Sequence, residues 1–535
     1  MILVSNYYTP SGVIPPPNGS VLPNNTEPAL ISVHLFLNST TNQNDASDAL
    51  HYDVFVTPVA RPGAVLTGNG TITINVKGQV KAIAVIPSTF LNDTISNMFF
   101  GEAITLSELK VWTPNPGNYT ATLNATVTVF ASLGGRIENM TVKQSRDISY
   151  EIVGNKVTLM MKVPSKAYPD LQSAIDAVPK GQSADIHILR GTYILPSTNP
   201  QITLKSNLRI HGDGIGKTIL KRSATLRDNF DYDMMSNPDG VDLENVTIED
   251  LTLDGMYPSD PLNYGGGCIV LSHNQVTVNE DIIVRRVEAK NANKGVGGRN
   301  FIGESWDDPG LTIEDCKIHN CWSLVSVING EYVKILNNDL RHTTSLAISG
   351  RTGGDAIYTE ATSVYLPEGQ DGSCHHWIIT GNYITDIGDT GLDITTSPAT
   401  GNAPYTTDIT MMNNTLVGAS VRINYADGVI FQNNVIKGSK TSILGRFKGG
   451  ISVDFGSQGP SRNVKINDNN LEPSPGRTDV IDLEETYNIE CVGNTFYLPY
   501  VITTPITQIF LGGDVKISNN TFINSPMPSS LYKAP

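Results

Sequence analysis

The chain has 535 residues, a formal net charge of −15 and only 17% charged residues. Neutralising a phosphate backbone requires concentrated Lys and Arg, so this composition argues against nucleic acid as a partner and equally against an anionic membrane surface. No apolar run approaches the ~18 residues of a membrane span, and residues 1–8 lack the basic and apolar regions of a conventional signal peptide.

Residues 1–28 are rich in Pro, Asn and Gly and include the run Pro15-Pro-Pro17. Such a segment cannot build a hydrophobic core, so we expect an extended arm that docks on a neighbouring molecule. From residue 29 to residue 163 the apolar residues alternate with polar ones, as in Ile72, Ile74 and Val76. This period of two, interrupted by Gly, Pro and Asn, predicts an antiparallel β-sandwich of the jelly-roll or immunoglobulin-like type.

The segment that follows opens with a helical pattern, in which Leu171, Ala174, Ile175 and Val178 fall on one face. We expect a short α-helix here that caps the first turn of a stacked structure spanning residues 164–535.

A short phrase then recurs ten times between Ile248 and Phe522: an apolar residue, two variable positions, a key residue, one variable position and another apolar residue. Steps between equivalent positions run from 20 residues (414 to 434) to 44 residues (338 to 382), which fits a unit of ~20–25 residues with loop insertions. Seven copies have Asn at the key position: Asn338, Asn382, Asn414, Asn434, Asn469, Asn494 and Asn520. Three earlier copies have Leu251, Val287 and Cys316 there.

One such unit cannot bury its own apolar face, so successive units must stack and share a continuous core. Asn suits a bend because it tolerates the left-handed backbone region and hydrogen-bonds nearby backbone groups. Stacked on the Asn of the next unit, its amide can also bond along the stacking axis. We therefore expect an amide ladder confined to the C-terminal part of the repeat.

These repeats, over roughly residues 165–525, resemble the single-stranded right-handed parallel β-helix of pectate lyases, polygalacturonases and viral tailspikes. The resemblance implies an all-β chain, in which an N-terminal antiparallel β-sandwich is followed by a right-handed parallel β-helix. It says little about activity, because one fold carries many functions. The complete motif set of polygalacturonases, with Asn-Thr-Asp, Asp-Asp, Gly-His-Gly and Arg-Ile-Lys, is absent from the sequence.

All five cysteines fall in the repeat region, and their spacing matches no zinc pattern. We interpret them as small buried core residues, with a Cys316–Cys321 disulfide as the alternative.

Asn-X-Ser/Thr sequons are dense in the first 140 residues. They predict a glycosylated surface, although a polar strand surface rich in Asn and Thr is an equal alternative. The candidate sites are Asn38, Asn69, Asn92, Asn118, Asn124, Asn139 and Asn245.

Acidic and aromatic residues gather in residues 300–395, which include the 44-residue step and three of the four tryptophans. Aromatic rings stack on sugars, carboxylates bind hydroxyls, and a carboxylate pair can hydrolyse a glycosidic bond. The catalytic candidates are Asp355, Asp389 and Asp393. The glycan-binding candidates are Trp306, Trp322, Trp377, Tyr358, Glu360 and Arg351. For the three aspartates, an ordinary role in turn structure is the alternative. They could also bind Ca²⁺. No other cofactor or metal is expected.

We interpret the chain as a spike or turret of a virion or other extracellular surface, with a low-charge composition like that of virion proteins from acidophilic archaeal hosts. Residues 1–163 would attach it to other structural proteins, and the β-helix would bind a host glycan or receptor. We also expect a homo-oligomer. The alternative is an enzyme, either a polysaccharide lyase or a glycoside hydrolase, that acts in a groove on the flank of the β-helix.

Overall fold

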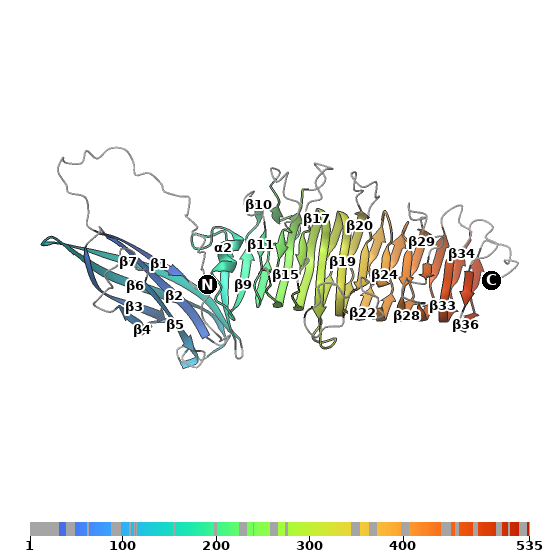
Figure 1. The fold of residues 1–535 in the computed structure, drawn as a ribbon, viewed down its shortest axis with the longest axis horizontal. Coiled ribbons are helices and arrows are strands. Elements are labelled where there is room, and N and C mark those ends of the chain that lie inside the picture. The colour runs from blue at the N-terminus through green and yellow to red at the C-terminus, as the bar shows by residue number, and fades with distance from the viewer. Residues whose placement is uncertain are drawn as a thin grey trace.

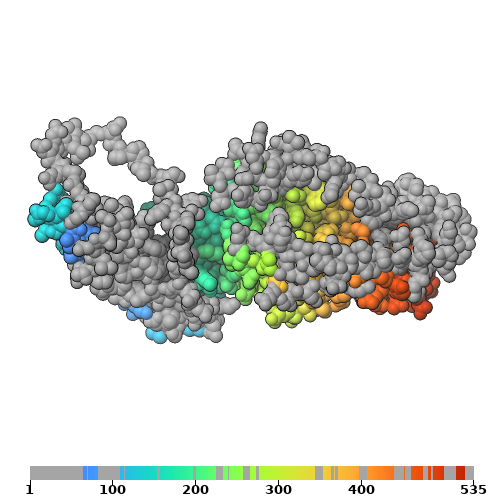
Figure 2. Space-filling view, in the orientation of Figure 1, coloured from blue at the N-terminus to red at the C-terminus, as the bar shows by residue number. Residues whose placement is uncertain are grey.

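The computed structural model places most of the chain in β-strands (Figure 1). It describes residues 31–38, 49–60, 64–86, 98–105, 109–111, 113, 115–153, 156–196, 201–223, 233–238, 240–256, 266–272, 276–343, 354–362, 367, 372–396, 406–439, 451–454, 460–473, 480–498, 506–511, 514–523 and 532–533. The predicted arm, residues 1–28, lies outside these ranges. Figures 1 and 2 show an elongated molecule, with the N-terminal strands (blue to cyan) at one end and the later strands (green to red) extending to the other.

The N-terminal strands are paired antiparallel in two sheets. Three strands form the first sheet in the order β1-β2-β5: β1 (Ile31–Asn38), β2 (Ala49–Ala60) and β5 (Met98–Thr105). The second sheet has the order β4-β3-β6-β7-β8: β4 (Gln79–Ile86), β3 (Val65–Val76), β6 (Gly117–Leu133), β7 (Arg136–Val153) and β8 (Lys156–Val163). β1 contacts β7 and β6 of the second sheet. The predicted antiparallel pairing is confirmed, whereas the sandwich type and the domain boundaries stay predictions.

Strand β8 joins this antiparallel sheet to the rest of the molecule. Its residues 156–160 pair antiparallel with β7, while its residues 158–163 pair parallel with β9 (Ser183–Ile188). The helix α2 (Leu171–Asp176) follows, capped by Asp170, whose carboxylate accepts a hydrogen bond from the Ser173 amide at 2.7 Å. Its buried face packs against β8, β9 and β11 (Ile202–Thr203). The predicted capping helix is therefore confirmed.

From β9 onward the chain winds into coils whose parallel strands stack in three rows, which we call A, B and C. Row A contains β9, β12 (Leu208–His211), β18 (Leu311–Glu314), β22 (Cys374–Thr380), β25 (Thr406–Met412), β28 (Ala426–Gln432), β31 (Arg462–Asn467) and β36 (Val515–Ser518). Row B contains β10 (Gly191–Ile194), β13 (Thr218–Lys221), β20 (Asp339–Thr343), β23 (Tyr383–Thr385), β26 (Thr415–Val417), β29 (Val435–Ser439), β32 (Asn470–Pro473), β34 (Thr495–Tyr497) and β37 (Thr521–Ile523).

Row C contains β11, β14 (Met235–Ser236), β16 (Ile269–Leu271), β21 (Ile357–Ala361), β24 (Leu392–Thr396), β27 (Val421–Asn424), β30 (Ile451–Asp454), β35 (Ile506–Leu511) and β38 (Tyr532–Lys533). Four long strands bend through more than one row: β15 (Leu243–Asp254), β17 (Asn279–Ile302), β19 (Lys317–Leu336) and β33 (Ile481–Val492). Each coil passes through A, B and C in turn, so the predicted parallel β-helix is confirmed.

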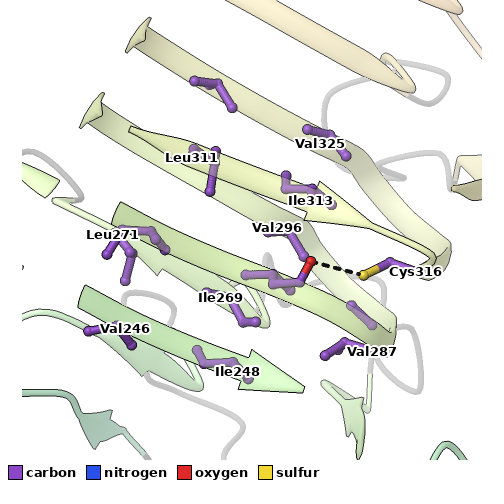
Figure 3. Close-up of a cluster of buried hydrophobic side chains, with 14 of the residues drawn as sticks. Val246, Ile248, Ile269, Leu271, Val287, Val296, Leu311, Ile313, Cys316 and Val325 are labelled. Atoms are coloured by element: carbon purple, nitrogen blue, oxygen red, sulfur yellow. Dashed lines mark hydrogen bonds between the residues drawn. The ribbon is translucent and has the colours of Figure 1, made fainter. Parts of the chain in front are cut away.

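The core of the β-helix consists of aliphatic side chains stacked coil upon coil (Figure 3). In row A, Val246 is aligned with Leu311 and Ile248 with Ile313 two rungs away, and Ile269 and Val296 from row C lie in the same core. Because strand residues alternate between faces, every second residue of each strand enters this core. Each coil thereby buries a face that it could not bury alone.

The predicted amide ladder runs along the turn between rows A and B. From Asn338 to Asn520, each Asn donates from its side-chain nitrogen to the side-chain oxygen of the next, at 2.9–3.2 Å. The ladder begins at Asn338, as the sequence indicated. The left-handed residue, however, is the one before each ladder Asn, such as Asn337 and Asn413, with φ near 55°. The ladder Asn is therefore selected by its hydrogen bonds rather than by its own backbone conformation.

All five cysteines are free and buried: Cys268, Cys316, Cys321, Cys374 and Cys491. The Sγ of Cys316 lies 3.5 Å from the carbonyl oxygen of Val284 (Figure 3). The alternative of a Cys316–Cys321 disulfide is wrong, because both thiols are free: Cys316 lies at the turn between rows A and B, and Cys321 lies at the far end of the row B rung.

Candidate functional site

The three predicted catalytic acids come together at the edge where row B gives way to row C. Asp355 precedes β21, Asp389 lies in the turn before β24, and Asp393 lies within β24. The amide of Thr390 donates to Asp355 Oδ1 at 3.0 Å, which ties the two neighbouring coils together. We call Asp355, Asp389 and Asp393 the acidic cluster.

The acidic cluster perturbs its own ionisation. Burial raises the pKa of Asp355 well above its ordinary value, and the nearby Asp393 and Asp389 raise that pKa further. Like charges confined in a poorly hydrated site cannot all ionise together, so Asp355 retains its proton to higher pH. The arrangement thus offers a protonated carboxyl beside other acidic side chains.

Tyr358 and Glu360 lie beside the acidic cluster on the outer face of row C. The Tyr358 hydroxyl donates to Glu360 Oε2 at 2.8 Å. Burial raises the pKa of Tyr358, and the nearby Glu360 and Asp393 raise it further. In the strand register Tyr358 is paired with Asp393, so both residues project from adjacent rungs of the same face. The hydroxyl and carboxylates therefore form one polar surface across two coils.

Arg422 adds a cation to this surface from the next rung. It is paired with Asp393 in the register, and its Nη1 lies 3.8 Å from Asp393 Oδ2. Sequence reasoning missed Arg422, yet the aligned segments Leu392-Asp-Ile and Val421-Arg-Ile would have placed it beside Asp393. The predicted cation, Arg351, lies outside the described residues.

Trp322 brings an indole ring to the same edge of the coil. Its carbonyl accepts a hydrogen bond from Gly354 at 2.7 Å, and the next residue of that coil is Asp355. A Cβ atom on Gly354 would lie 2.4 Å from this carbonyl oxygen and 3.3 Å from the indole Cδ2, so glycine allows the two backbones to approach closely beside the ring. The half-buried Trp322 and the half-buried Tyr358 are the aromatic residues of this site.

Lys294 marks the N-terminal end of the same flank. It lies in the row C rung that pairs with Ser323, three coils before the rung of Asp393. Burial lowers the pKa of Lys294, whereas the nearby Asp233 and Glu360 oppose that shift. The polar surface thus extends from Lys294 through Glu360 and the acidic cluster to Arg422.

Trp306 lies elsewhere, at the turn from row C to row A. Its ring packs edge-on against Tyr332, with 5.4 Å between centroids, and Tyr332 stacks on His376 at 4.5 Å. His375 and His376 lie next to each other, with 2.5 Å between their Nδ1 atoms. The predicted glycan-binding residues are therefore divided between two edges of the coil.

Trp377 belongs to the core. It is fully buried, and its indole N–H donates to the carbonyl of Gly330 at 2.8 Å. The prediction of a glycan contact at Trp377 is wrong, because its position on β22 points inward and leaves no ring face for a sugar.

Within the ranges that the structure describes, no three His, Cys, Asp or Glu side chains form a group that could hold a metal ion. Over the same residues, no helix is long and apolar enough to cross a bilayer.

Neither a protein-family model nor a curated protein matches the sequence. Among solved structures, the Dettilon tailspike protein is 14% identical, with a TM-score of 0.41, over 66% of this chain and 62% of that chain. The catalytic domain of a GH87 alpha-1,3-glucanase is 12% identical, with a TM-score of 0.31, over 92% of this chain and 97% of that one. An alginate lyase from Paenibacillus sp. str. FPU-7 is 12% identical, with a TM-score of 0.30, over 66% and 96%. Matches this distant do not say what the present chain binds.

Proposed function

We propose that the protein binds a polysaccharide on the outer face of row C, as the recognition part of an extracellular or virion surface assembly. The observation that carries this proposal is the convergence of the acidic cluster with Tyr358, Arg422 and Trp322 from successive coils. A carboxylate or a guanidinium can hydrogen-bond two neighbouring sugar hydroxyls at once. An indole can cover the apolar face of a sugar ring.

Attachment of the protein through residues 1–163 to other structural proteins, and its assembly into a homo-oligomer, complete the proposal. The repeating rungs of row C also suit a polymer, because a chain of sugars can follow successive coils along the axis.

Binding can be tested by affinity electrophoresis against plant, algal and microbial polysaccharides and against surface polysaccharide from host cells. Tyr358→Phe removes one hydroxyl from row C, and Tyr383→Phe makes the same change on the exposed face of row B. We expect Tyr358→Phe to weaken binding about tenfold, roughly the contribution of one hydrogen bond to a charged group. Equal affinity of both variants would contradict a site on row C.

Hydrolysis is the second candidate function, and the raised pKa of Asp355 favours it. A carboxyl whose pKa is raised keeps its proton to higher pH and can protonate a glycosidic oxygen, while an ionised carboxylate nearby acts as base or nucleophile. Asp355 would then be the general acid, with Asp393 or Asp389 as its partner. This assignment favours a glycoside hydrolase over a lyase, whose first requirement is a base.

Turnover separates the two functions. The panel of polysaccharides is incubated with the protein while reducing ends and unsaturated products are measured. New reducing ends that disappear in Asp355→Asn would establish hydrolysis. Binding without any product would leave the protein a recognition module, and unsaturated products would point to a lyase.

A further inference from the structure

Three of the predicted sequons share one face of the antiparallel sheet. Asn118 and Asn124 lie on β6, and Asn139 lies on the neighbouring β7. The opposite face of β6 is apolar and fully buried, as at Leu123, Val127 and similar alternate residues. Because successive strand residues face opposite ways, the three asparagines all belong to the outer face.

These asparagines are accessible and their amide nitrogens are not engaged. Asn118 and Asn139 are exposed, and Asn124 is half-exposed. Asn124 uses its side-chain oxygen to accept a hydrogen bond from the Ser145 hydroxyl at 2.8 Å. Within the part of the chain that the structure describes, none of the three side-chain nitrogens donates a hydrogen bond. The atom that carries an N-linked sugar is thus open to solvent.

The hydroxyl residue of each sequon lies on the same face as its asparagine, because the two are separated by one residue of a strand. Thr120 and Thr141 are exposed, and Thr126 is half-exposed. Each sequon is therefore presented whole, with both of its recognition side chains pointing outward.

The sequons of the coil differ in this respect. Asn245 has a left-handed backbone, with φ of 55°, and donates from its side-chain nitrogen to Asn207 Oδ1 at 3.0 Å. Asn413 and Asn519 also have left-handed φ values of 55° and 57°, in the turns next to the amide ladder. The side-chain nitrogen of Asn245 therefore has a structural role that a sugar would disturb.

We propose that the outer face of β6 and β7 is N-glycosylated at Asn118, Asn124 and Asn139, and that Asn245 is not modified. In this modification the asparagine side-chain nitrogen bonds to C1 of a sugar carried by a lipid-linked phosphate donor. The bond between C1 and the phosphate oxygen breaks, the phosphate keeps the electron pair, and a transferase accepts the amide proton.

The other predicted glycosylation sites cannot be compared in the same way. Asn69 on β3 is paired with Thr128 of β6, which places it next to the same strands. Its side chain lies outside the described residues, as does that of Asn38, and Asn92 lies outside them altogether.

Glycans on this face would restrict which surface of the antiparallel part can contact another protein. Figure 2 shows the end of the β6–β7 hairpin (cyan) at the tip of the molecule farthest from the coil. A face covered by glycans cannot pack closely against another protein, so the attachment surface of the antiparallel part would lie elsewhere. This inference is independent of polysaccharide binding on row C, because either property can exist without the other.

The test is peptide mapping of the protein isolated from the cells in which it is naturally made. Electron-transfer fragmentation keeps the bond between sugar and asparagine intact and so assigns each site. Asn139 lies in the short tryptic peptide 137–143, apart from the peptide that contains Asn118 and Asn124. We expect glycan mass at all three sites and none at Asn245. Unmodified peptides for the three sites, or equal modification of Asn245, would overturn the proposal.

A matched pair of variants made in the same cells tests the sequon itself. Thr141→Val removes the hydroxyl that pairs with Thr128 at 2.8 Å, whereas Thr141→Ser keeps a hydroxyl there. We expect Thr141→Val to lose the mass of one glycan and Thr141→Ser to keep it. If both variants keep the glycan mass, or if both lose it, Asn139 is not recognised through its sequon.

Discussion

Burial decides the chemistry of single residues in the coil, and the cysteines show this most simply. Burial raises the pKa of the Cys268, Cys316 and Cys491 thiols to about 12 and that of Cys374 to about 11. The thiolate is the reactive form, so these groups should be inert in the folded protein.

We therefore predict that a thiol reagent modifies none of the cysteines in the native protein and all 5 after denaturation, since the chain contains 5. Mass spectrometry after alkylation with iodoacetamide, with and without guanidinium chloride, measures this directly. A denatured, unreduced sample that takes up fewer than 5 labels would reveal a disulfide and contradict the buried thiols.

The same physics applied to Asp355 predicts a pH-dependent stability. Between the ordinary pKa and the raised pKa, the folded chain holds a proton that the unfolded chain has released. Folding stability therefore falls as pH rises through this window, by about 1.4 kcal/mol for each pH unit. Asp355→Asn has no such proton and retains an oxygen for the Thr390 amide.

We expect Asp355→Asn to melt at a higher temperature than the natural protein, by a margin that grows as pH rises from the ordinary pKa of Asp355 towards its raised pKa. Thermal unfolding followed by circular dichroism provides the measurement. Asp307→Asn, which changes an exposed acid, is the control and should leave the margin near zero. If the difference in melting temperature between Asp355→Asn and the natural protein shrank with rising pH, Asp355 would be ionised in the folded protein.

Single residues also show where sequence reasoning ends. Asp355, Asp389 and Asp393 could be selected because they lie in residues 300–395, in or just after the irregular step of the repeat. Trp377 could not be recognised as a core residue, because tryptophan density alone does not show which ring faces inward. Arg422 belongs to a regular rung, so a search guided by irregularity passed over it.

At the scale of the element, the amide ladder adds buried side-chain hydrogen bonds between successive coils to the backbone pairing of the strands. Asn414 illustrates the arrangement: its oxygen accepts from the backbone N–H and the side-chain nitrogen of Asn382, and its own nitrogen donates to Ile379 and Asn434. All of these groups are buried, so removing one asparagine leaves several of them without a partner.

We predict that Asn414→Ala destabilises the protein strongly, because each buried group left unsatisfied costs about 1–3 kcal/mol. Asn520→Ala removes the equivalent residue at the end of the ladder, which is half-exposed, and water can replace its bonds there. The melting temperature should therefore fall much more for Asn414→Ala than for Asn520→Ala. An equal fall in melting temperature for the two variants would mean that burial of the ladder residue does not determine its contribution to stability.

The ladder was predictable because one residue type recurs at one position of a repeat. Other side-chain contacts at left-handed positions were not, since their residue types vary from coil to coil. Tyr332 stacks on His376, and Asn488 donates to Asn463, at corresponding bends at the start of row A. A pattern of mixed residues leaves no periodic signal, although the backbone geometry is the same.

At the scale of the molecule, β8 makes the antiparallel part and the β-helix one continuous sheet. Its residues Leu159 and Met161 are buried, and they pair in the register with Ala184 and Ile186 of β9. In the sequence, β8 has the alternating pattern of the antiparallel region. The predicted boundary between residues 163 and 164 therefore assigns this strand to the N-terminal unit. The pairing shows that β8 is also the first rung of row A.

The position of the boundary can be tested with two shortened chains, 156–535 and 164–535. The longer chain keeps β8 over the end of the hydrophobic core, whereas the shorter one exposes both the core and the free edge of β9. Exposed edges and apolar ends promote aggregation, and repeat proteins require a cap for solubility. We predict that soluble yield and melting temperature fall in the order full chain, 156–535, 164–535. If 164–535 melted at the temperature of the full chain, α2 alone would suffice as the cap, and β8 would belong to the antiparallel part alone.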